Sequence, residues 1–154
     1  MSDTETAGRG PGAEQASAET RAAALVHLID AFRHGDLATL QRAMAPDVEL
    51  VARGRHPYAG TYRGSAAALA FVARTAQWID VSSLQVEGVV TEPEFTVNIV
   101  ATVRPMEGKT MRTELQAEFH FDEEDRIRRA VFKATDQKAL DAFLTRYAAR
   151  GVSR

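Results

Sequence analysis

The sequence has no cysteine among its 154 residues. A chain without thiols cannot form a disulfide framework, a thiolate nucleophile or a thiolate metal site. It also lacks a glycine-rich phosphate loop, a serine nucleophile elbow and a pair of histidines at metal-ligand spacing on one predicted helix. We therefore expect a fold held together by packing alone, with neither a metal nor a cofactor.

The sequence also has no excess of charge of one sign. Its 19 Lys and Arg residues face 21 Asp and Glu residues, so the formal net charge is -2. Nucleic-acid-binding domains normally carry a basic surface, so we expect no nucleic-acid partner. No run approaches the roughly 20 apolar residues of a membrane helix, and the N-terminal segment lacks the basic and apolar regions of a secretory signal. These absences predict a cytoplasmic protein outside the membrane.

What is present is the composition of one globular domain, with 45% hydrophobic and 26% charged residues. Residues 1–18 carry few large apolar side chains and several glycines. Such a segment buries too little apolar surface to offset the entropy of ordering, so we expect a disordered tail. The remaining residues 19–150 are expected to form a single domain.

Helical spacing of apolar residues and capping residues define the predicted helices. Gly35 follows the first as a C-terminal cap, and Asp36 is an N-cap for a short second helix that Pro46 ends. Ser65 is expected to cap the third. The predicted helices cover residues 20–34, 37–44, 66–78 and 136–149.

The second half of the chain changes to the alternating pattern of strands, with β-branched or aromatic residues at every other position. The breaks between these segments are short enough for antiparallel hairpins. Helices first and hairpin-connected strands afterwards indicate an α+β fold, a curved antiparallel sheet wrapped around the N-terminal helices with a cavity between them. The predicted strands cover residues 48–51, 84–90, 95–104, 110–121 and 126–134.

Three short motifs carry a family resemblance: AFRHGDL at residues 31–37, MAPDV at 44–48 and HPYAGTYRG at 56–64. They resemble the opening and the mouth loop of the SnoaL-like and ketosteroid isomerase-like proteins, which share the nuclear transport factor 2-like cone fold. The resemblance covers about residues 20 to 147. It implies the fold and a small-molecule site, but this fold hosts several enzymes as well as ligand binders, so the function must be argued from the site.

Two chemistries of the resembled families lack their residues here. Alignment to the ketosteroid isomerase pattern places Leu28, Ala52 and Ala117 at the tyrosine, base and acid positions, so the set required for that mechanism is missing. The epoxide hydrolase relay would need a carboxylate in the strand before the last helix, which reads AVFKA at residues 130–134. Polyketide cyclase chemistry needs only a proton-accepting group, donors for an enolate and an apolar cavity.

Along residues 112–121 of the predicted strand, polar side chains alternate with a set that is apolar except for Thr113. Because successive side chains of a strand point to opposite faces, the apolar set belongs inside and Glu118 and His120 belong outside. We interpret these two residues as part of a polar outer face, and the family resemblance implies that two copies form a homodimer through this face. The alternative, a catalytic Glu118–His120 pair, stays open at this stage.

Few polar residues remain for the inside of the predicted cone. His56, Tyr58 and Tyr62 on the mouth loop are the candidate catalytic residues, because an imidazole can exchange protons near neutral pH and a phenol can donate to an enolate. In the alternative, Tyr58 and Tyr62 only close the end of the cone, and His56 is exposed to solvent. The residues expected to line a ligand site are Leu28, Phe32, Phe71, Trp78, Ala117 and Phe119.

These observations support one leading hypothesis and two alternatives. The leading one is a cofactor-free cyclase or isomerase that acts on a hydrophobic, polyketide-like metabolite in a bacterial biosynthetic pathway. The first alternative is a non-catalytic carrier, sensor or protective protein for such a molecule, and the second is a dimeric scaffold.

Overall fold

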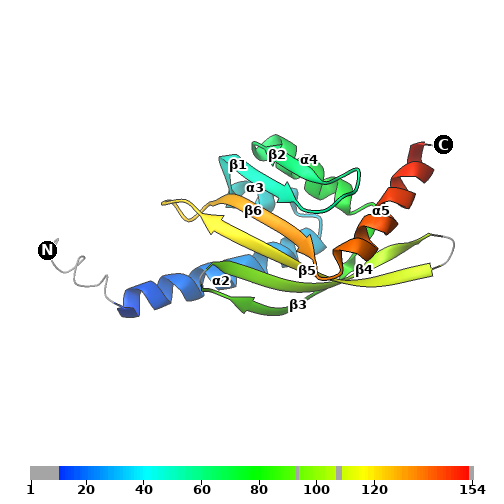
Figure 1. Cartoon of the computed structure of the whole chain (residues 1–154). Helices are drawn as coiled ribbons and strands as arrows, with labels where there is room; N and C mark the ends of the chain where they lie inside the picture. Colours follow the sequence, from blue (N-terminus) through cyan, green and yellow to red (C-terminus); the bar gives the residue numbers. More distant parts are fainter. Residues whose placement is uncertain (1–10, 93, 107–108, 153–154) are drawn as a thin grey trace, which may run out of the picture.

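A computed structural model describes residues 11–92, 94–106 and 109–152 of the chain. Helices occupy mainly the first half and strands mainly the second, which confirms the predicted α+β class (Figure 1). In chain order the elements are α2 (Pro11–Arg33), α3 (Leu37–Ala43), β1 (Met44–Ala52), β2 (Gly60–Arg63), α4 (Ser65–Thr75), β3 (Ile79–Val90), β4 (Phe95–Met106), β5 (Lys109–Phe121), β6 (Ile127–Ala134) and α5 (Gln137–Val152).

Helix α2 begins at Pro11, earlier than the predicted start, so residues 11–18 of the predicted tail continue the helix. Residues 1–10 of that predicted tail lie outside the described residues. Residues 13–18 of this segment comprise three Ala, one Glu, one Gln and one Ser, and Ala, Glu and Gln have high helix propensity. Further along α2, Arg21 holds the helix to the β5–β6 turn. Its Nε donates to Asp125 Oδ1 at 2.8 Å, and its guanidinium lies 5.0 Å from the centre of the Phe121 ring.

The helix caps observed in the structure match the prediction at the α2–α3 junction and differ from it at the start of α4. Gly35 has a φ of 70°, and Asp36 Oδ1 accepts a hydrogen bond from the backbone N–H of Thr39 at 3.1 Å, as predicted for a cap. At α4 the prediction is wrong, because the N-cap is Gly64, with a φ of 88°, and Ser65 is the first helical residue. Helix α4 also ends at Thr75, before Trp78.

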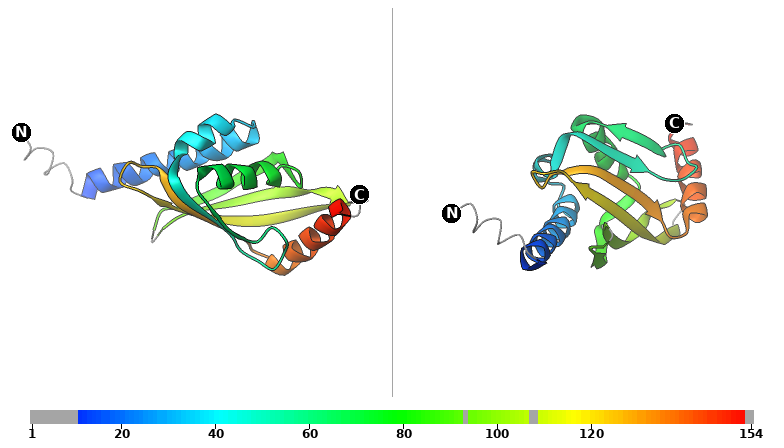
Figure 2. Two further views of the ribbon diagram at one scale, coloured as in Figure 1. Left: turned by 90° about the horizontal axis from the view of Figure 1, so that it is seen from above. Right: turned by 60° about the vertical axis from the view of Figure 1, so that its left-hand side comes forward.

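The strands form one sheet in the order β2-β1-β6-β5-β4-β3. All neighbouring pairs are antiparallel except β1 and β6, which run parallel, so the sheet is not purely antiparallel as predicted. These two strands are far apart in the sequence and need no hairpin to join them. The register of β3 against β4 shifts twice, and such irregularities bend a sheet. The curved, open sheet is visible in Figure 2.

The predicted alternation of β5 is confirmed. Thr113, Ala117 and Phe119 are buried on its inner face, whereas Glu114 is exposed on the other. Helix α2 contacts β3, α4 contacts β1 and β2, and α5 contacts β6, so helices cover the inner face and one end of the sheet (Figures 1 and 2). The apolar core lies between these helices and the sheet.

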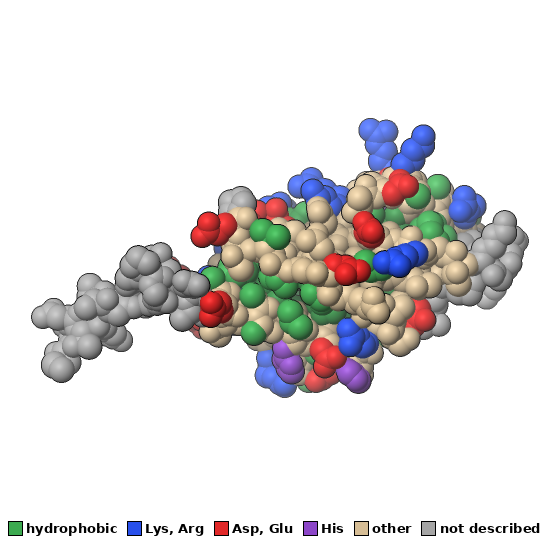
Figure 3. All heavy atoms as spheres, turned by 90° about the horizontal axis from the view of Figure 1, so that it is seen from below, with side chains coloured by type: hydrophobic (Ala, Val, Ile, Leu, Met, Phe, Trp, Pro, Cys, Tyr) green, Lys and Arg blue, Asp and Glu red, His purple; other side chains and the backbone are tan. Residues whose placement is uncertain are grey.

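The surface carries charges of both signs. Acidic and basic side chains are interspersed on the face shown in Figure 3, with apolar atoms between them. Within the described residues, each helix is too short or too polar to span a bilayer.

Candidate functional site

A cavity of about 150 Å³ lies between the helices and the inner face of the sheet. Nearly every element of the fold contributes to its wall, and most contributing side chains are apolar. The apolar part of the wall consists of Leu28, Ile29, Phe32, Leu40, Ala52, Phe71, Val72, Trp78, Ile79, Leu84, Ile99, Leu115, Phe119, Phe132, Ala134, Leu140 and Leu144. The polar residues in the wall are Arg53, His56, Thr75, Lys133 and Gln137.

The structure places all but one of the predicted lining residues on this wall: Leu28, Phe32, Phe71, Trp78 and Phe119. Ala117 does not line the cavity, although it is fully buried on the inner face of β5. Its partner in register on β6 is Phe132, whose ring meets that of Phe119 edge to face at 6.1 Å between centroids and lines the cavity instead. Phe132 on the adjacent strand β6 therefore separates the small Ala117 side chain from the cavity.

Tyr58 and Tyr62 are not among the lining residues. The Tyr62 hydroxyl donates to the backbone carbonyl of Tyr58 at 2.7 Å, and the Tyr62 ring packs against Phe71 with 4.5 Å between centroids. The Arg74 guanidinium lies 5.9 Å from the centre of the Tyr58 ring. In this arrangement both tyrosines close the loop against α4, and the Tyr62 hydroxyl is engaged within the protein.

His56 lines the cavity, and its side chain is only 4% exposed. Its Nδ1 lies 3.2 Å from the backbone N–H of Tyr58, and its Nε2 lies 3.2 Å from the carbonyl oxygen of Arg53. Because Nδ1 accepts, the proton of the neutral ring belongs on Nε2, where it is donated to Arg53. These bonds hold the imidazole in one orientation and one tautomer.

Two residues of α5 join His56 in a polar cluster. Asp141 Oδ1 lies 4.0 Å from His56 Nε2 and accepts a hydrogen bond from Gln137 Nε2 at 2.9 Å. Gln137 Oε1 in turn accepts from the backbone N–H of Ala134 at 2.8 Å. We call His56, Gln137 and Asp141 the polar cluster. Sequence reasoning missed Gln137 and Asp141; their one local signal is a spacing that puts both on one face of the last helix.

The parallel pairing of β1 and β6 brings the polar cluster together. Parallel strands end at the same edge of a sheet, and the backbone N–H of Arg53, just after β1, donates to Phe132 O near the end of β6 at 2.9 Å. Gly54 comes next, with a φ of 124°. A Cβ atom there would lie 2.5 Å from Gln137 Nε2 and 2.9 Å from His56 Cδ2. Glycine therefore lets the backbone approach the cluster closely.

Burial lowers the pKa of His56 below its usual 6.5, and the nearby Asp141 carboxylate opposes this effect only in part. Desolvation penalises the charged imidazolium, so the neutral ring is favoured. At neutral pH His56 is therefore a neutral imidazole, able to act as a base, at the wall of the cavity.

The lowered pKa of His56 predicts a pH dependence of stability. Below pH 6.5 the unfolded chain takes up a proton at His56 before the folded chain does, so the free energy of unfolding falls as the pH drops from 6.5 to the folded-state pKa. In His56→Gln this component is removed, and urea denaturation between pH 7.5 and 5 should show a flatter profile. The control is His34→Gln, whose side chain is 69% exposed. A profile for His56→Gln as steep as that of the wild type would contradict the assignment.

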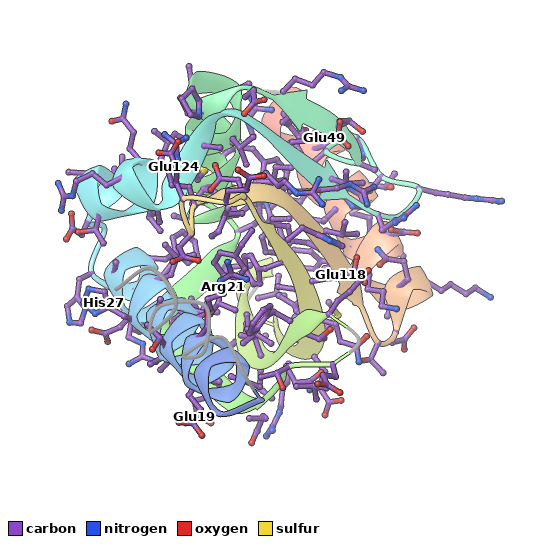
Figure 4. The ribbon with its side chains drawn as sticks, turned by 90° about the vertical axis from the view of Figure 1, so that its left-hand side faces the viewer. Glu19, Arg21, His27, Glu49, Glu118 and Glu124 are labelled. Atoms are coloured by element: carbon purple, nitrogen blue, oxygen red, sulfur yellow. The ribbon has the colours of Figure 1, made fainter. Side chains whose placement is uncertain are left out.

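A second group of polar side chains lies on the outer face of the sheet, where the sequence placed Glu118 and His120. Glu118 is labelled in Figure 4. His120 Nε2 lies 3.1 Å from Glu118 Oε2 and 3.5 Å from Glu94 Oε2. The hydrogen bond with His120 lowers the pKa of Glu118. Potential ligand atoms of the three residues lie within 4.8 Å of one another, as they would around an ion. The group is separated from the cavity by the sheet.

Comparisons with known proteins agree with this architecture. The family model described as "SnoaL-like domain" matches residues 25–130. A search of the curated proteins found no match to the sequence.

Three solved structures illustrate the likeness of fold. An NTF2-like protein of unknown function from Burkholderia pseudomallei is 19% identical, with a TM-score of 0.70 over 81% of this chain and 97% of its own. TerC, crystallised with polyporic acid, is 19% identical with a TM-score of 0.68 over 82% and 98% of the two chains. A candidate SnoaL-like polyketide cyclase from Shewanella denitrificans is 17% identical, with a TM-score of 0.63 over 80% and 96%.

Proposed function

The chain belongs to the SnoaL-like domain family, and we propose that its cavity binds a small, largely apolar molecule. The observation that carries this proposal is the composition of the wall, in which aliphatic and aromatic side chains from α2, α4, α5 and the sheet surround one space. Ligand sites are typically concave and apolar, with a few polar groups that orient the ligand. Transfer of an apolar molecule from water into such a site is favourable by about 25 cal/mol per Å² of buried surface.

The size of the cavity limits the ligand. Its volume of about 150 Å³ is similar to that of an apolar cavity, engineered in another protein, that binds benzene. A compound with one ring therefore fits the space as it stands. A larger, polyketide-like metabolite of the kind predicted from the sequence requires lining side chains or α5 to move outward.

Proton transfer at the cavity wall is a second candidate function, favoured by the approach of Asp141 to the buried His56. A neutral imidazole near a carboxylate that stabilises its protonated form can serve as a general base. Both ring nitrogens are engaged in the protein, so His56 must release the Tyr58 N–H before Nδ1 can accept a proton. A cyclase or isomerase acting on a hydrophobic, polyketide-like metabolite would use this base. The alternative is a non-catalytic carrier, which binds the molecule without any proton transfer.

Filling the cavity tests the binding proposal. Ala134 lines the cavity and is buried, so Ala134→Leu adds three carbon atoms to the wall. We expect the affinity for ethylbenzene, measured by NMR titration, to fall at least about tenfold, or about 1.4 kcal/mol. The matched control is Ala24→Leu, at an exposed position of α2, which should bind ethylbenzene like the wild type.

Thermal denaturation checks that both variants fold. Equal affinity of the wild type and folded Ala134→Leu, or no binding by the wild type, would refute the proposal.

The homodimer through the outer sheet face and the cytoplasmic location stay predictions.

A further inference from the structure

Trp78 combines burial with an unused hydrogen-bond donor. It is the only tryptophan of the sequence, and it lines the cavity with 5% of its surface exposed. Its backbone N–H is satisfied by Thr75 O at 3.1 Å. The indole Nε1 is buried and has no hydrogen-bond partner among the residues that the structure describes.

Other polar groups at the wall differ from Trp78 in this respect. The Thr75 hydroxyl donates to Val72 O at 2.7 Å, and the side chains of His56 and Gln137 are bonded within the protein. Arg53 and Lys133 are exposed and can reach water. Among the wall residues in the described part of the chain, Trp78 therefore has the buried side-chain donor that lacks a partner.

Leaving a buried N–H unpaired is unfavourable, and buried tryptophans usually find a partner for this group. The indole N–H donates and cannot accept, so its complement must be an acceptor. An acceptor that carries a full charge would be costly to move into an apolar cavity. A neutral carbonyl or ether oxygen on an otherwise apolar molecule meets both conditions.

We propose that Trp78 determines the ligand class of this cavity: a compact apolar molecule, of about one ring, with a neutral hydrogen-bond acceptor that receives the Trp78 Nε1–H. This inference rests on the proposed binding function and adds to it a specificity-determining residue. The remaining wall supplies shape and apolar contact, and it distinguishes poorly between molecules of the same size.

The test compares two compounds of nearly the same shape, acetophenone and ethylbenzene, of which acetophenone carries a carbonyl oxygen. With one tryptophan in the chain, a ¹H–¹⁵N NMR spectrum contains one indole N–H signal. We expect acetophenone to shift this signal downfield, as hydrogen bonding does, and ethylbenzene to shift it little. The ratio of the two affinities should favour acetophenone and fall about tenfold in Trp78→Phe, the effect of one hydrogen bond at the upper end of its usual net contribution.

The outcomes separate this inference from the binding proposal beneath it. If both compounds bind with shifts around the cavity but the indole signal responds equally to them, Trp78 is a core residue and the inference is wrong. If neither compound binds, both the binding proposal and the inference about Trp78 are wrong. The indole shift is measured on the wild-type protein, so the test stands even where Trp78→Phe folds poorly.

Discussion

Truncation of Leu144 to alanine is expected to lower the free energy of unfolding by about 2–5 kcal/mol. Leu144 on α5 is fully buried, so its side chain contacts the core wherever it does not face the cavity. Removing three carbons loses their transfer free energy and their contacts, and it opens a space that adjoins the existing cavity. The larger the space left after relaxation, the larger the cost.

Urea denaturation monitored by circular dichroism measures this change. Leu37→Ala is the matched control, because the same atoms are removed from a side chain that is 43% exposed at the start of α3. The control should change stability by no more than about 0.5 kcal/mol. Similar losses of unfolding free energy in the two variants would show that Leu144 is not packed in the core beside the cavity.

Exchange of a carbon-bound proton should depend on His56 if the cavity performs chemistry. A base that removes a proton from the methyl carbon of acetophenone forms an enolate, which takes a deuteron from D2O, so the methyl signal in the ¹H NMR spectrum decays. General base catalysis typically contributes about 10²–10⁴-fold. We expect His56→Gln to slow the protein-dependent exchange by a factor in this range, because glutamine cannot accept the proton.

Two further variants make the result specific. Asp141→Asn keeps the shape of the side chain but removes the carboxylate that favours protonated His56, so a smaller loss is expected. His34→Gln, at an exposed position on the surface, should exchange like the wild type. A wild-type protein that binds acetophenone without accelerating exchange would favour the carrier over the enzyme.

Local patterns in the sequence were sufficient to predict much of the fold and several of the apolar residues that line the cavity. The Gly35–Asp36 junction is specified by neighbouring residues, since a glycine with positive φ ends one helix and an aspartate caps the next. The alternation along β5 likewise determined which face is buried, because successive side chains of any strand point to opposite sides. That rule placed Phe119 inside and Glu118 outside without knowledge of the partner strands.

His56 was a candidate from the sequence, but only the tertiary structure decided which polar residues surround it. His56 meets Asp141 only because β1 and β6 pair in parallel and α5 starts at the same edge, and no local pattern encodes the pairing of strands so far apart. The same packing turned the Tyr62 hydroxyl onto the Tyr58 carbonyl and left the Trp78 indole nitrogen without a partner among the described residues. Sequence determines which groups can donate or accept, whereas the packed chain determines which of them remain free for a ligand.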